Sequence, residues 1–178
     1  KYCMGVNSGT DALYLSLLCA RIGRGDEVIV PVNTAVPTAM AVAMSGATPV
    51  FADCDENFLI DIDKIPRLLT KKTKAIMPVH LYGQACDMKR LKKLAVAHKL
   101  FLVEDCAQAT GAEWGGKKVG TWGDFGCFSF YPTKNLGAYG DGGAIIVNNE
   151  DYYKKLLALR FYGQADRIYC SGFGINSR

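Results

Sequence analysis

The most constraining feature of this sequence is a regular alternation of short apolar runs with helix-like segments over its first hundred or so residues. We expect the apolar runs, which are rich in β-branched residues, to be strands at 28–30, 49–52, 75–79 and 101–104. We expect helices where apolar residues recur with helical spacing, at 10–22, 37–45, 63–69 and 87–98. Continuously apolar strands joined to helices by short connections predict an α/β fold with a mostly parallel sheet sandwiched by helices.

The texture changes between residues 111 and 143, where glycine and aromatic residues are frequent. Short strand-like pieces at 125–128 and 144–147 lie within or next to this stretch, and a helix-like segment follows at 150–159. Long irregular segments in an otherwise regular α/β domain usually carry binding or catalytic residues. We therefore expect the functional site to use this part of the chain.

Size and composition exclude several classes of protein. A chain of 178 residues with 49% apolar residues favours one globular domain and excludes disorder. No membrane span is expected, because the longest weakly polar stretch, 34–46, is short and is interrupted by Pro37 and Ser45. The net charge of +4 is spread along the chain without a basic and aromatic stripe, so we expect no nucleic-acid partner.

The seven cysteines form no Cys-x-x-Cys pair, and only two histidines accompany them. This arrangement predicts no metal site, and a disulfide framework would leave one thiol over. Most of the cysteines lie among apolar residues, where they are typical small core side chains. We expect a reduced, cytoplasmic protein.

Three short segments carry residues suited to chemistry. The first, Asn7 to Asp11, places small and hydroxylated residues at the start of a helix, where free N–H groups attract an anion. A simple helix cap by Ser8 or Thr10 would also explain it. The second places Glu104 and Asp105 at the end of an apolar strand, where open α/β sheets bind ligands, although such residues can also be merely solvated there.

The third segment, Phe128 to Gly137, holds Lys134 between aromatic and turn-forming residues. A lysine must lose its proton to act as a nucleophile, and a partly desolvated setting favours the neutral amine. A single loop lysine is more often a surface residue. Taken together, however, the three segments supply what pyridoxal phosphate requires, namely donors for its phosphate, an anion for its ring nitrogen and an amine for its aldehyde.

These segments also carry a resemblance to a known family. The sequence resembles the DegT/DnrJ/StrS group of sugar aminotransferases, whose large domain has the type I fold of pyridoxal-phosphate-dependent transferases. The resemblance rests on segments 7–13, 25–31, 46–51, 78–84, 104–108 and 128–143, and extends to the last residue.

The resemblance implies one role for each matching residue. Lys134 matches the lysine that forms a Schiff base with the cofactor and moves the proton, and Asp105 matches the partner of the ring nitrogen. Gln108 matches a glutamine near the ring hydroxyl. Further matches to cofactor-binding positions are Ser8, Gly9, Thr10, Ser129 and Asn176. Asn176 resembles an asparagine that reaches the cofactor phosphate of a neighbouring subunit, which implies a homodimer with shared active sites.

The implied reaction is the transfer of an amino group from L-glutamate to a 3-keto or 4-keto deoxy sugar carried by a nucleotide. Its product would serve polysaccharide, glycan or antibiotic biosynthesis. Because Lys134 is present, transamination is favoured over the dehydration catalysed by a branch that has histidine there. The sequence departs from the family at Ala35, where an aromatic residue often covers the cofactor ring. For His80 and Tyr82, structural roles are favoured over substrate contact.

The first residue is Lys1, and the chain ends in loop-like sequence. We therefore expect residues 1–178 to be the cofactor-binding large domain, with an N-terminal segment and a C-terminal small domain lying outside them. The alternative function is a non-catalytic, pyridoxal-phosphate-binding regulatory or assembly protein of the same fold. A nucleotide-hydrolase site at 111–117 is not expected, because Lys118 stands where a P-loop needs serine or threonine.

Overall fold

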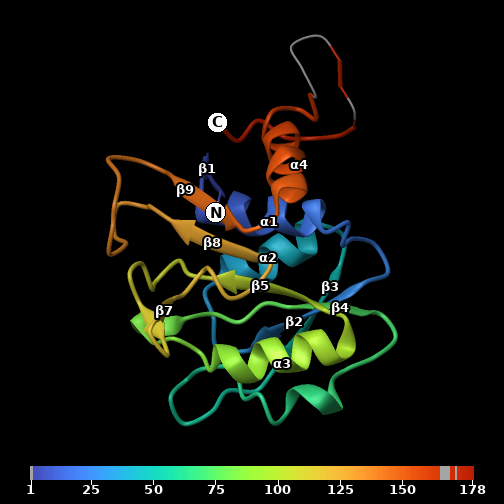
Figure 1. The fold of residues 1–178 in the computed structure, drawn as a ribbon, viewed down its shortest axis with the longest axis vertical. Coiled ribbons are helices and arrows are strands. Elements are labelled where there is room, and N and C mark those ends of the chain that lie inside the picture. The colour runs from blue at the N-terminus through green and yellow to red at the C-terminus, as the bar shows by residue number, and fades with distance from the viewer. Residues whose placement is uncertain (1, 165–168, 171) are drawn as a thin grey trace.

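The computed structural model describes residues 2–164, 169–170 and 172–178. Its centre is a seven-stranded sheet with the strand order β1-β9-β8-β5-β4-β2-β3 (Figure 1). The strands of this sheet are β1 (Tyr2–Val6), β2 (Glu27–Pro31), β3 (Thr48–Ala52), β4 (Thr73–Ile76), β5 (Phe101–Asp105), β8 (Phe125–Ser129) and β9 (Gly143–Val147).

The sheet is mostly parallel, as predicted. Strands β3, β2, β4, β5 and β8 pair in parallel with their neighbours, whereas β9 is antiparallel to both β8 and β1. The carboxyl ends of the five parallel strands consequently meet at one edge of the sheet. This is the edge at which open α/β sheets bind ligands.

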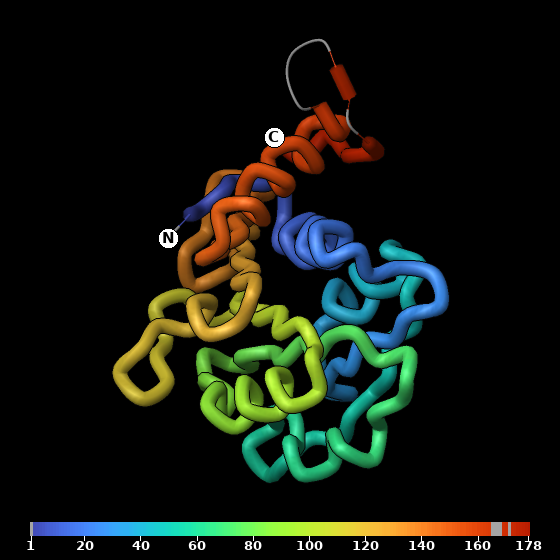
Figure 2. Tube along the Cα trace, turned by 45° about the vertical axis from the view of Figure 1, so that its right-hand side comes forward, coloured from blue at the N-terminus to red at the C-terminus, as the bar shows by residue number. Residues whose placement is uncertain are grey.

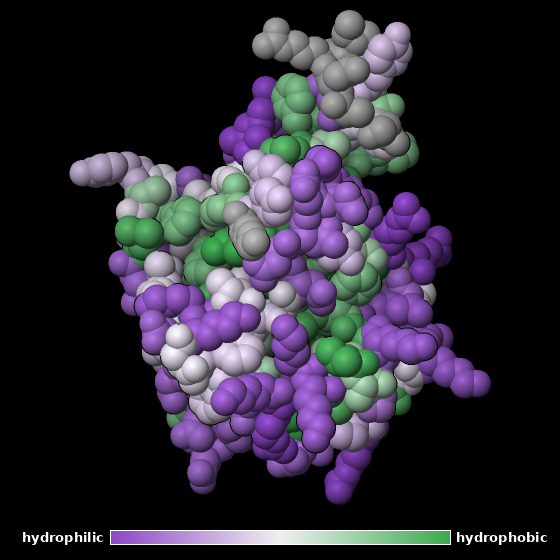
Figure 3. All heavy atoms as spheres, viewed as in Figure 1, coloured by the Kyte–Doolittle hydropathy of each residue, from purple (hydrophilic) through white to green (hydrophobic). Residues whose placement is uncertain are grey.

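Helices cover both faces of the sheet, because successive residues of each central strand point to opposite sides. Val28 and Val30 join an apolar cluster with α1 (Gly9–Cys19), α2 (Val36–Met44) and α4 (Glu150–Arg160), whereas Ile29 joins a second cluster with α3 (Met88–His98). The outer surface over α3 is mostly hydrophilic (Figure 3), as its lysine-rich sequence requires. The predicted sandwich is confirmed.

Of the four described α-helices, three begin after a residue whose side chain accepts a hydrogen bond from the first turn, whereas α2 follows Ala35 and has Pro37 in its first turn. Ser8 accepts from the Asp11 amide at α1, Asp87 from the Arg90 amide at α3, and Asn149 from the Tyr152 amide at α4, each at 3.0 Å. Such caps satisfy amides that have no partner within the helix. The helix bounds confirm four of the five predicted helices, α2 included, to within a few residues at each end.

The predicted helix at 63–69 is wrong. Only a single 3₁₀ turn forms there, η1 (Ile65–Arg67), and the Leu68 amide bonds to the Ile65 carbonyl in the tight pattern of that turn. The segment is too short to propagate a helix, because the conformational free energy needed to form the first turn exceeds what the hydrogen bonds of a few further residues contribute. Burial of Ile65 under the α3 side of the sheet holds the turn in place.

Two further strand pairs were not predicted. The residues of β1 show no strand pattern that would distinguish them from the start of α1. The strand nevertheless pairs with β9 along its whole length. Residues 113–118 form a small hairpin of β6 (Glu113–Trp114) and β7 (Lys117–Lys118), turned by Gly115 and Gly116 at φ of 56° and 77°. The segment that superficially matches a P-loop is therefore a hairpin.

The end of the chain returns to its beginning (Figure 2). The hydroxyl of Ser177 accepts the Asn7 amide at 3.0 Å and donates to Asp11 at 2.5 Å, and the Asn7 side chain donates to the Asn176 carbonyl. These bonds attach residues 176–177 to the start of α1. Among the described helices, none has both the length and the apolar character needed to cross a membrane.

The cysteines behave as the sequence predicts for core residues. All seven are free thiols, and Cys19, Cys86, Cys106 and Cys127 are buried. Burial raises the pKa of Cys19 to about 11 and that of Cys86 to about 12. Thiols that stay protonated at neutral pH are poor nucleophiles.

Candidate active site

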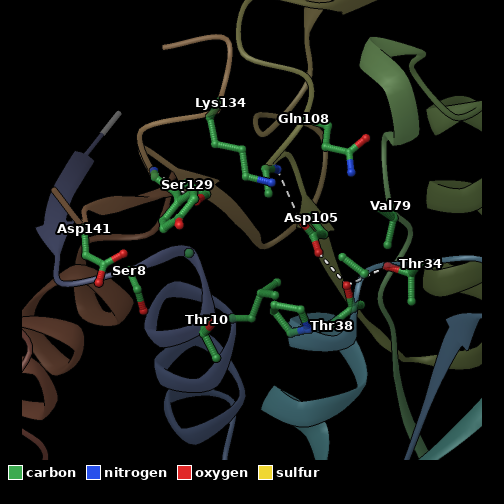
Figure 4. A pocket seen from close by; sticks show the side chains of 16 residues that line it. Ser8, Thr10, Thr34, Thr38, Val79, Asp105, Gln108, Ser129, Lys134 and Asp141 are labelled. Atoms are coloured by element: carbon green, nitrogen blue, oxygen red, sulfur yellow. Dashed lines mark hydrogen bonds between the residues drawn. The ribbon is translucent and has the colours of Figure 1, made fainter. Parts of the chain in front are cut away.

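A cavity of about 230 Å³ lies at the carboxyl edge of the sheet. It is bounded by the ends of β5 and β8, the first turns of α1 and α2, and the connection from β8 to β9 (Figure 4). Seven of the eight predicted site residues line it: Ser8, Gly9, Thr10, Asp105, Gln108, Ser129 and Lys134. Segments separated by more than a hundred residues in the sequence thus meet in one place.

The start of α1 presents free hydrogen-bond donors to this cavity. Ser8 is the helix cap, and its side chain and carbonyl accept the amides of Asp11 and Ala12. Within the described part of the chain, the amides of Gly9 and Thr10 have no hydrogen-bond partner. Together with the helix dipole and the nearby Ser129 hydroxyl, they form an environment suited to an anion such as a phosphate.

Gly9 is required for this close approach of helix and sheet. A Cβ atom at position 9 would lie 2.6 Å from the Cβ of Ser129, a distance that real Cβ atoms do not reach. On the other side of the helix start, a Cβ at Gly143 would lie 2.5 Å from the Ser8 carbonyl. The two glycines allow the first turn of α1 to pack directly against the ends of β8 and β9.

Asp105, the last residue of β5, is 4% exposed, and its carboxylate reaches the cavity. One oxygen accepts the Thr38 hydroxyl at 2.8 Å and the other accepts the Ala107 amide at 3.1 Å. Burial raises the pKa of the Asp105 carboxyl, and these two hydrogen bonds together with the nearby charge of Lys134 only partly offset the effect. A cation bound in the cavity would relieve this buried charge.

Thr38 is the functional residue that the sequence analysis missed. It lies in the first turn of α2 and is 1% exposed, and its hydroxyl also shares a 2.7 Å hydrogen bond with that of Thr34. Thr34 precedes the helix, so no helical spacing in the sequence singled out this pair. Val79, Tyr131 and Asp141 also line the cavity and were not predicted.

Lys134 enters the cavity from the β8–β9 connection, and its side chain extends toward Asp105 (Figure 4). It is partly buried, and its amine makes no hydrogen bond or ion pair with the residues that the structure describes. The amine is therefore available to a ligand. Its backbone amide bonds to the Tyr131 carbonyl at 2.8 Å, which holds the turn that carries it.

Gln108 faces the same space from the loop after β5. Its side-chain oxygen accepts the Tyr82 amide at 2.9 Å. That bond orients the amide group and leaves its nitrogen as a donor toward the cavity.

Glu104, the neighbour of Asp105, points to the opposite face and does not line the cavity. Its buried carboxylate accepts the amides of Gly120, Trp122 and Gly123 and lies 3.2 Å from Nε2 of His80. His80 Nδ1 accepts the Cys86 amide, so Nε2 carries the proton and donates to Glu104. The structural role favoured for His80 fits this network.

Three potential metal ligands also meet at this network. His80, Glu104 and the Cys106 thiol lie within 4.8 Å of one another. The carboxylate already accepts three amides, and burial raises the pKa of the Cys106 thiol well above its ordinary value. A metal ion there would have to displace satisfied hydrogen bonds and ionise a buried thiol.

Asn176 lies outside the cavity, whereas Ala35 lines it. Asn176 does not line this cavity; its side chain accepts a bond from Arg178, and its carbonyl accepts the Asn7 side chain. Ala35 lines the cavity as predicted, with only a methyl group. Tyr131, which is half exposed, is the one aromatic residue among the lining side chains.

Known proteins are similar to this chain over nearly its whole length. A relative from Micromonospora megalomicea subsp. nigra, a dTDP-3-amino-3,4,6-trideoxy-alpha-D-glucose transaminase, is 50% identical over 99% of this chain and 48% of its own length. The Pleiotropic regulatory protein of Geobacillus stearothermophilus is 46% identical over 100% of this chain and 48% of its own length. The chain thus spans about half the length of these curated relatives.

A solved structure has the same fold. The crystal structure of DesV from S. venezuelae, in complex with a ketimine intermediate, superposes with a TM-score of 0.97 at 44% identity, covering 100% of this chain and 48% of that one. The model of the DegT/DnrJ/EryC1/StrS aminotransferase family matches residues 1–178. This chain belongs to the DegT/DnrJ/EryC1/StrS aminotransferase family.

Proposed function

We propose that this chain is the cofactor-binding large domain of a longer pyridoxal-phosphate-dependent aminotransferase. The observation that carries the proposal is the meeting, in one cavity, of three groups that are available to a ligand. They are the free amides at the start of α1, the buried carboxylate of Asp105 and the amine of Lys134. An anion-binding, a cation-binding and a nucleophilic group in this arrangement match the phosphate, the ring nitrogen and the aldehyde of the cofactor.

The phosphate would be held by the amides of Gly9 and Thr10 and by the hydroxyls of Thr10 and Ser129. Ser8 contributes by capping the helix, which leaves those two amides free. Each of these donors is uncharged, so the positive end of the α1 dipole supplies the electrostatic attraction.

Asp105 would hold a proton on the ring nitrogen. Its buried carboxylate is destabilised without a partner, and it gains most from a cation placed against it. Thr38 would keep the carboxylate oriented and charged by donating its hydroxyl. Gln108 would donate its side-chain amide to a ring substituent.

Lys134 would act at two points. Its amine would attach the cofactor, and once released by the amino donor it would carry a proton between the substrate carbon and the cofactor. When bound, pyridoxal phosphate supplies the electron sink that makes this proton transfer possible. A positioned amine acting as general acid and base contributes roughly 10²–10⁴-fold to such a step.

For substrates we propose L-glutamate as amino donor and a nucleotide-linked keto sugar, with the ketone at C3 or C4, as acceptor. The printed name of the Micromonospora relative, a transaminase of a dTDP-linked amino deoxy sugar, supports this class of acceptor.

We further propose a cytoplasmic homodimer in which Asn176 serves the site of the other subunit. Two observations support the dimer. Asn176 is exposed and lies outside the cavity of its own chain, and α2 carries exposed Val36 and Met40 beside that cavity. The seven free thiols are typical of a reducing compartment. Sedimentation analysis of the longer protein tests the dimer.

A non-catalytic regulatory protein of the same fold is the second candidate. The relative named Pleiotropic regulatory protein favours it. The lysine argues against it, because a protein that only binds the cofactor has no need of an unpaired amine at this position.

The absorbance spectrum of the longer protein with pyridoxal phosphate separates the two candidates. We expect a visible band that bleaches when L-glutamate is added and returns when the keto sugar nucleotide follows. Lys134→Ala should abolish turnover. A band that forms but does not respond to any amino donor would favour the regulatory protein, and a well-folded protein without a band would refute both proposals.

A further inference from the structure

A second cavity, which we call the polar cavity, adjoins the first and has a volume of about 470 Å³. Its lining residues are Tyr82, Gln108, Thr133, Lys134 and Asn135. Gln108 and Lys134 belong to both cavities, so the two spaces meet at the amine that we propose to be reactive. A molecule in the polar cavity would therefore present an atom to Lys134.

Tyr82 has a backbone conformation that costs energy. It has φ of 56° and ψ of 25°, in the left-handed region that residues other than glycine rarely adopt, and it is 67% exposed. Nothing in the burial of its own side chain explains this strain. Strained backbone held in place by its surroundings is concentrated at functional sites.

The surroundings of Tyr82 hold it firmly. The two residues before it, His80 and Leu81, are buried, and His80 is fixed between Glu104 and the Cys86 amide. The Tyr82 amide itself donates to the side chain of Gln108 at 2.9 Å. The ring is consequently presented to the polar cavity by a rigid turn.

A second exposed aromatic residue braces the ring of Tyr82. The ring of Phe58 meets it edge to face, with centroids 6.5 Å apart and planes at 79°. Phe58 is 58% exposed and also has a positive φ, of 64°. Two strained and exposed aromatic residues in contact form a platform at the mouth of the polar cavity.

We propose that the polar cavity receives the ring of the acceptor sugar, with Tyr82 as the surface on which the ring packs and with Thr133 and Asn135 as partners for its hydroxyl groups. This inference rests on the proposed aminotransferase function and adds the place where the acceptor is recognised. An aromatic face with uncharged donors and acceptors around it suits a ring that has both C–H and O–H groups.

The same lining disfavours glutamate as the occupant. Of its five lining residues, only Lys134 is charged, and that amine is required for the chemistry. The side-chain carboxylate of glutamate would enter the polar cavity without a cation of its own. A neutral polyhydroxylated ring has no such requirement.

The test measures the two half-reactions separately in the longer protein, by the absorbance of the bound cofactor. For Tyr82→Ala we expect kcat/KM for the keto sugar nucleotide to fall about tenfold or more, with the glutamate half-reaction changed by less than about twofold. Tyr82→Gly, which removes the ring and relieves the backbone strain, should give the same pattern in a protein that folds at least as well. Val96→Ala, at an equally exposed apolar residue of α3, is the control.

Equal losses in both half-reactions would overturn the inference, because they would indicate that Tyr82 acts through Gln108 on the cofactor. Unchanged kinetics with both substrates would overturn it as well. An unmodified protein with no cofactor band would instead refute the proposed function itself, and with it the inference.

Discussion

Replacing Glu104 by glutamine tests whether the site depends on the buried network beneath it. The Glu104 carboxylate is fully buried and accepts four donors, which are three backbone amides at 2.7–2.8 Å and Nε2 of His80 at 3.2 Å. One oxygen serves Trp122 and Gly123, and the other serves Gly120 and His80. The change removes one acceptor atom and places an amide nitrogen in its position.

The cost follows from counting the donors left without an acceptor. In either orientation of the glutamine side chain, its NH₂ group faces two N–H groups that it cannot satisfy. Each unsatisfied buried donor costs about 1–3 kcal/mol, so Glu104→Gln should lower the free energy of unfolding by about 2–6 kcal/mol. That is a large share of the roughly 5–15 kcal/mol typical of a folded domain.

Urea denaturation followed by tryptophan fluorescence measures this loss, with Glu56→Gln as the matched control. Glu56 is exposed and makes no hydrogen bond or ion pair among the described residues, so its replacement should change the unfolding free energy by less than about 0.5 kcal/mol. If Glu104→Gln changed stability no more than Glu56→Gln does, the assignment of Glu104 as the anchor of residues 120–123 would be refuted.

Three further predictions concern the cavity. Asp105→Asn should stabilise the cofactor-free protein at neutral pH while abolishing cofactor-dependent activity: because burial raises the pKa of the Asp105 carboxyl, its contribution to stability is complete at low pH and is lost as pH rises through that pKa. Denaturation at several pH values should therefore show the advantage of Asp105→Asn shrinking toward acid pH, and a constant advantage would contradict the argument. Thr38→Val should raise the Kd of the cofactor about tenfold, from the loss of a hydrogen bond to a charged group, whereas Thr38→Ser should restore it; spectroscopic titration measures both, and equal affinity of the two variants would count against the role of the hydroxyl. Gly9→Ala should weaken cofactor binding and destabilise the fold by about 1–3 kcal/mol, because its Cβ would meet that of Ser129, whereas Gly5→Ala, which has open space, should do neither in thermal unfolding and titration.

Periodicity predicted the parallel core of this fold because β2, β4, β5 and β8 are buried at most of their residues and so form continuous apolar runs in the sequence. The same reasoning fails at the edge formed by β1. β1 is half exposed and reads as mixed sequence, and its strand character comes from pairing with β9 more than a hundred residues later. The segment 63–69 has apolar residues at suitable positions, yet its burial is satisfied by one 3₁₀ turn at Ile65.

The candidate site divides in a comparable way. Residues whose chemistry matches a stage of the proposed reaction, such as Asp105 and Lys134, stood out by type and position. Thr38 did not, and for Tyr82 the sequence favoured a structural role, because the importance of both residues lies in partners distant in the sequence. The Thr38 hydroxyl matters only once α2 is packed against the end of β5, and Tyr82 matters only through the turn that strains it.

At this edge of the sheet, Glu104 and Asp105 are neighbours in the sequence but differ in how many hydrogen-bond donors surround each carboxylate. Glu104 and Asp105 are adjacent and buried, but alternation along β5 sends them to opposite faces. Glu104 meets four donors, and its charge is fully balanced by the fold itself. Asp105 accepts hydrogen bonds from only two donors, and burial beside an open cavity raises its pKa. The described residues do not supply a cation in contact with its carboxylate. A buried carboxylate without enough hydrogen-bonding or charged partners lowers the free energy of unfolding. A ligand that supplies the missing partner binds more tightly for that reason and stabilises the folded protein. It is this incompleteness, more than the presence of an acidic residue, that leads us to propose Asp105 as the binding group of the pair.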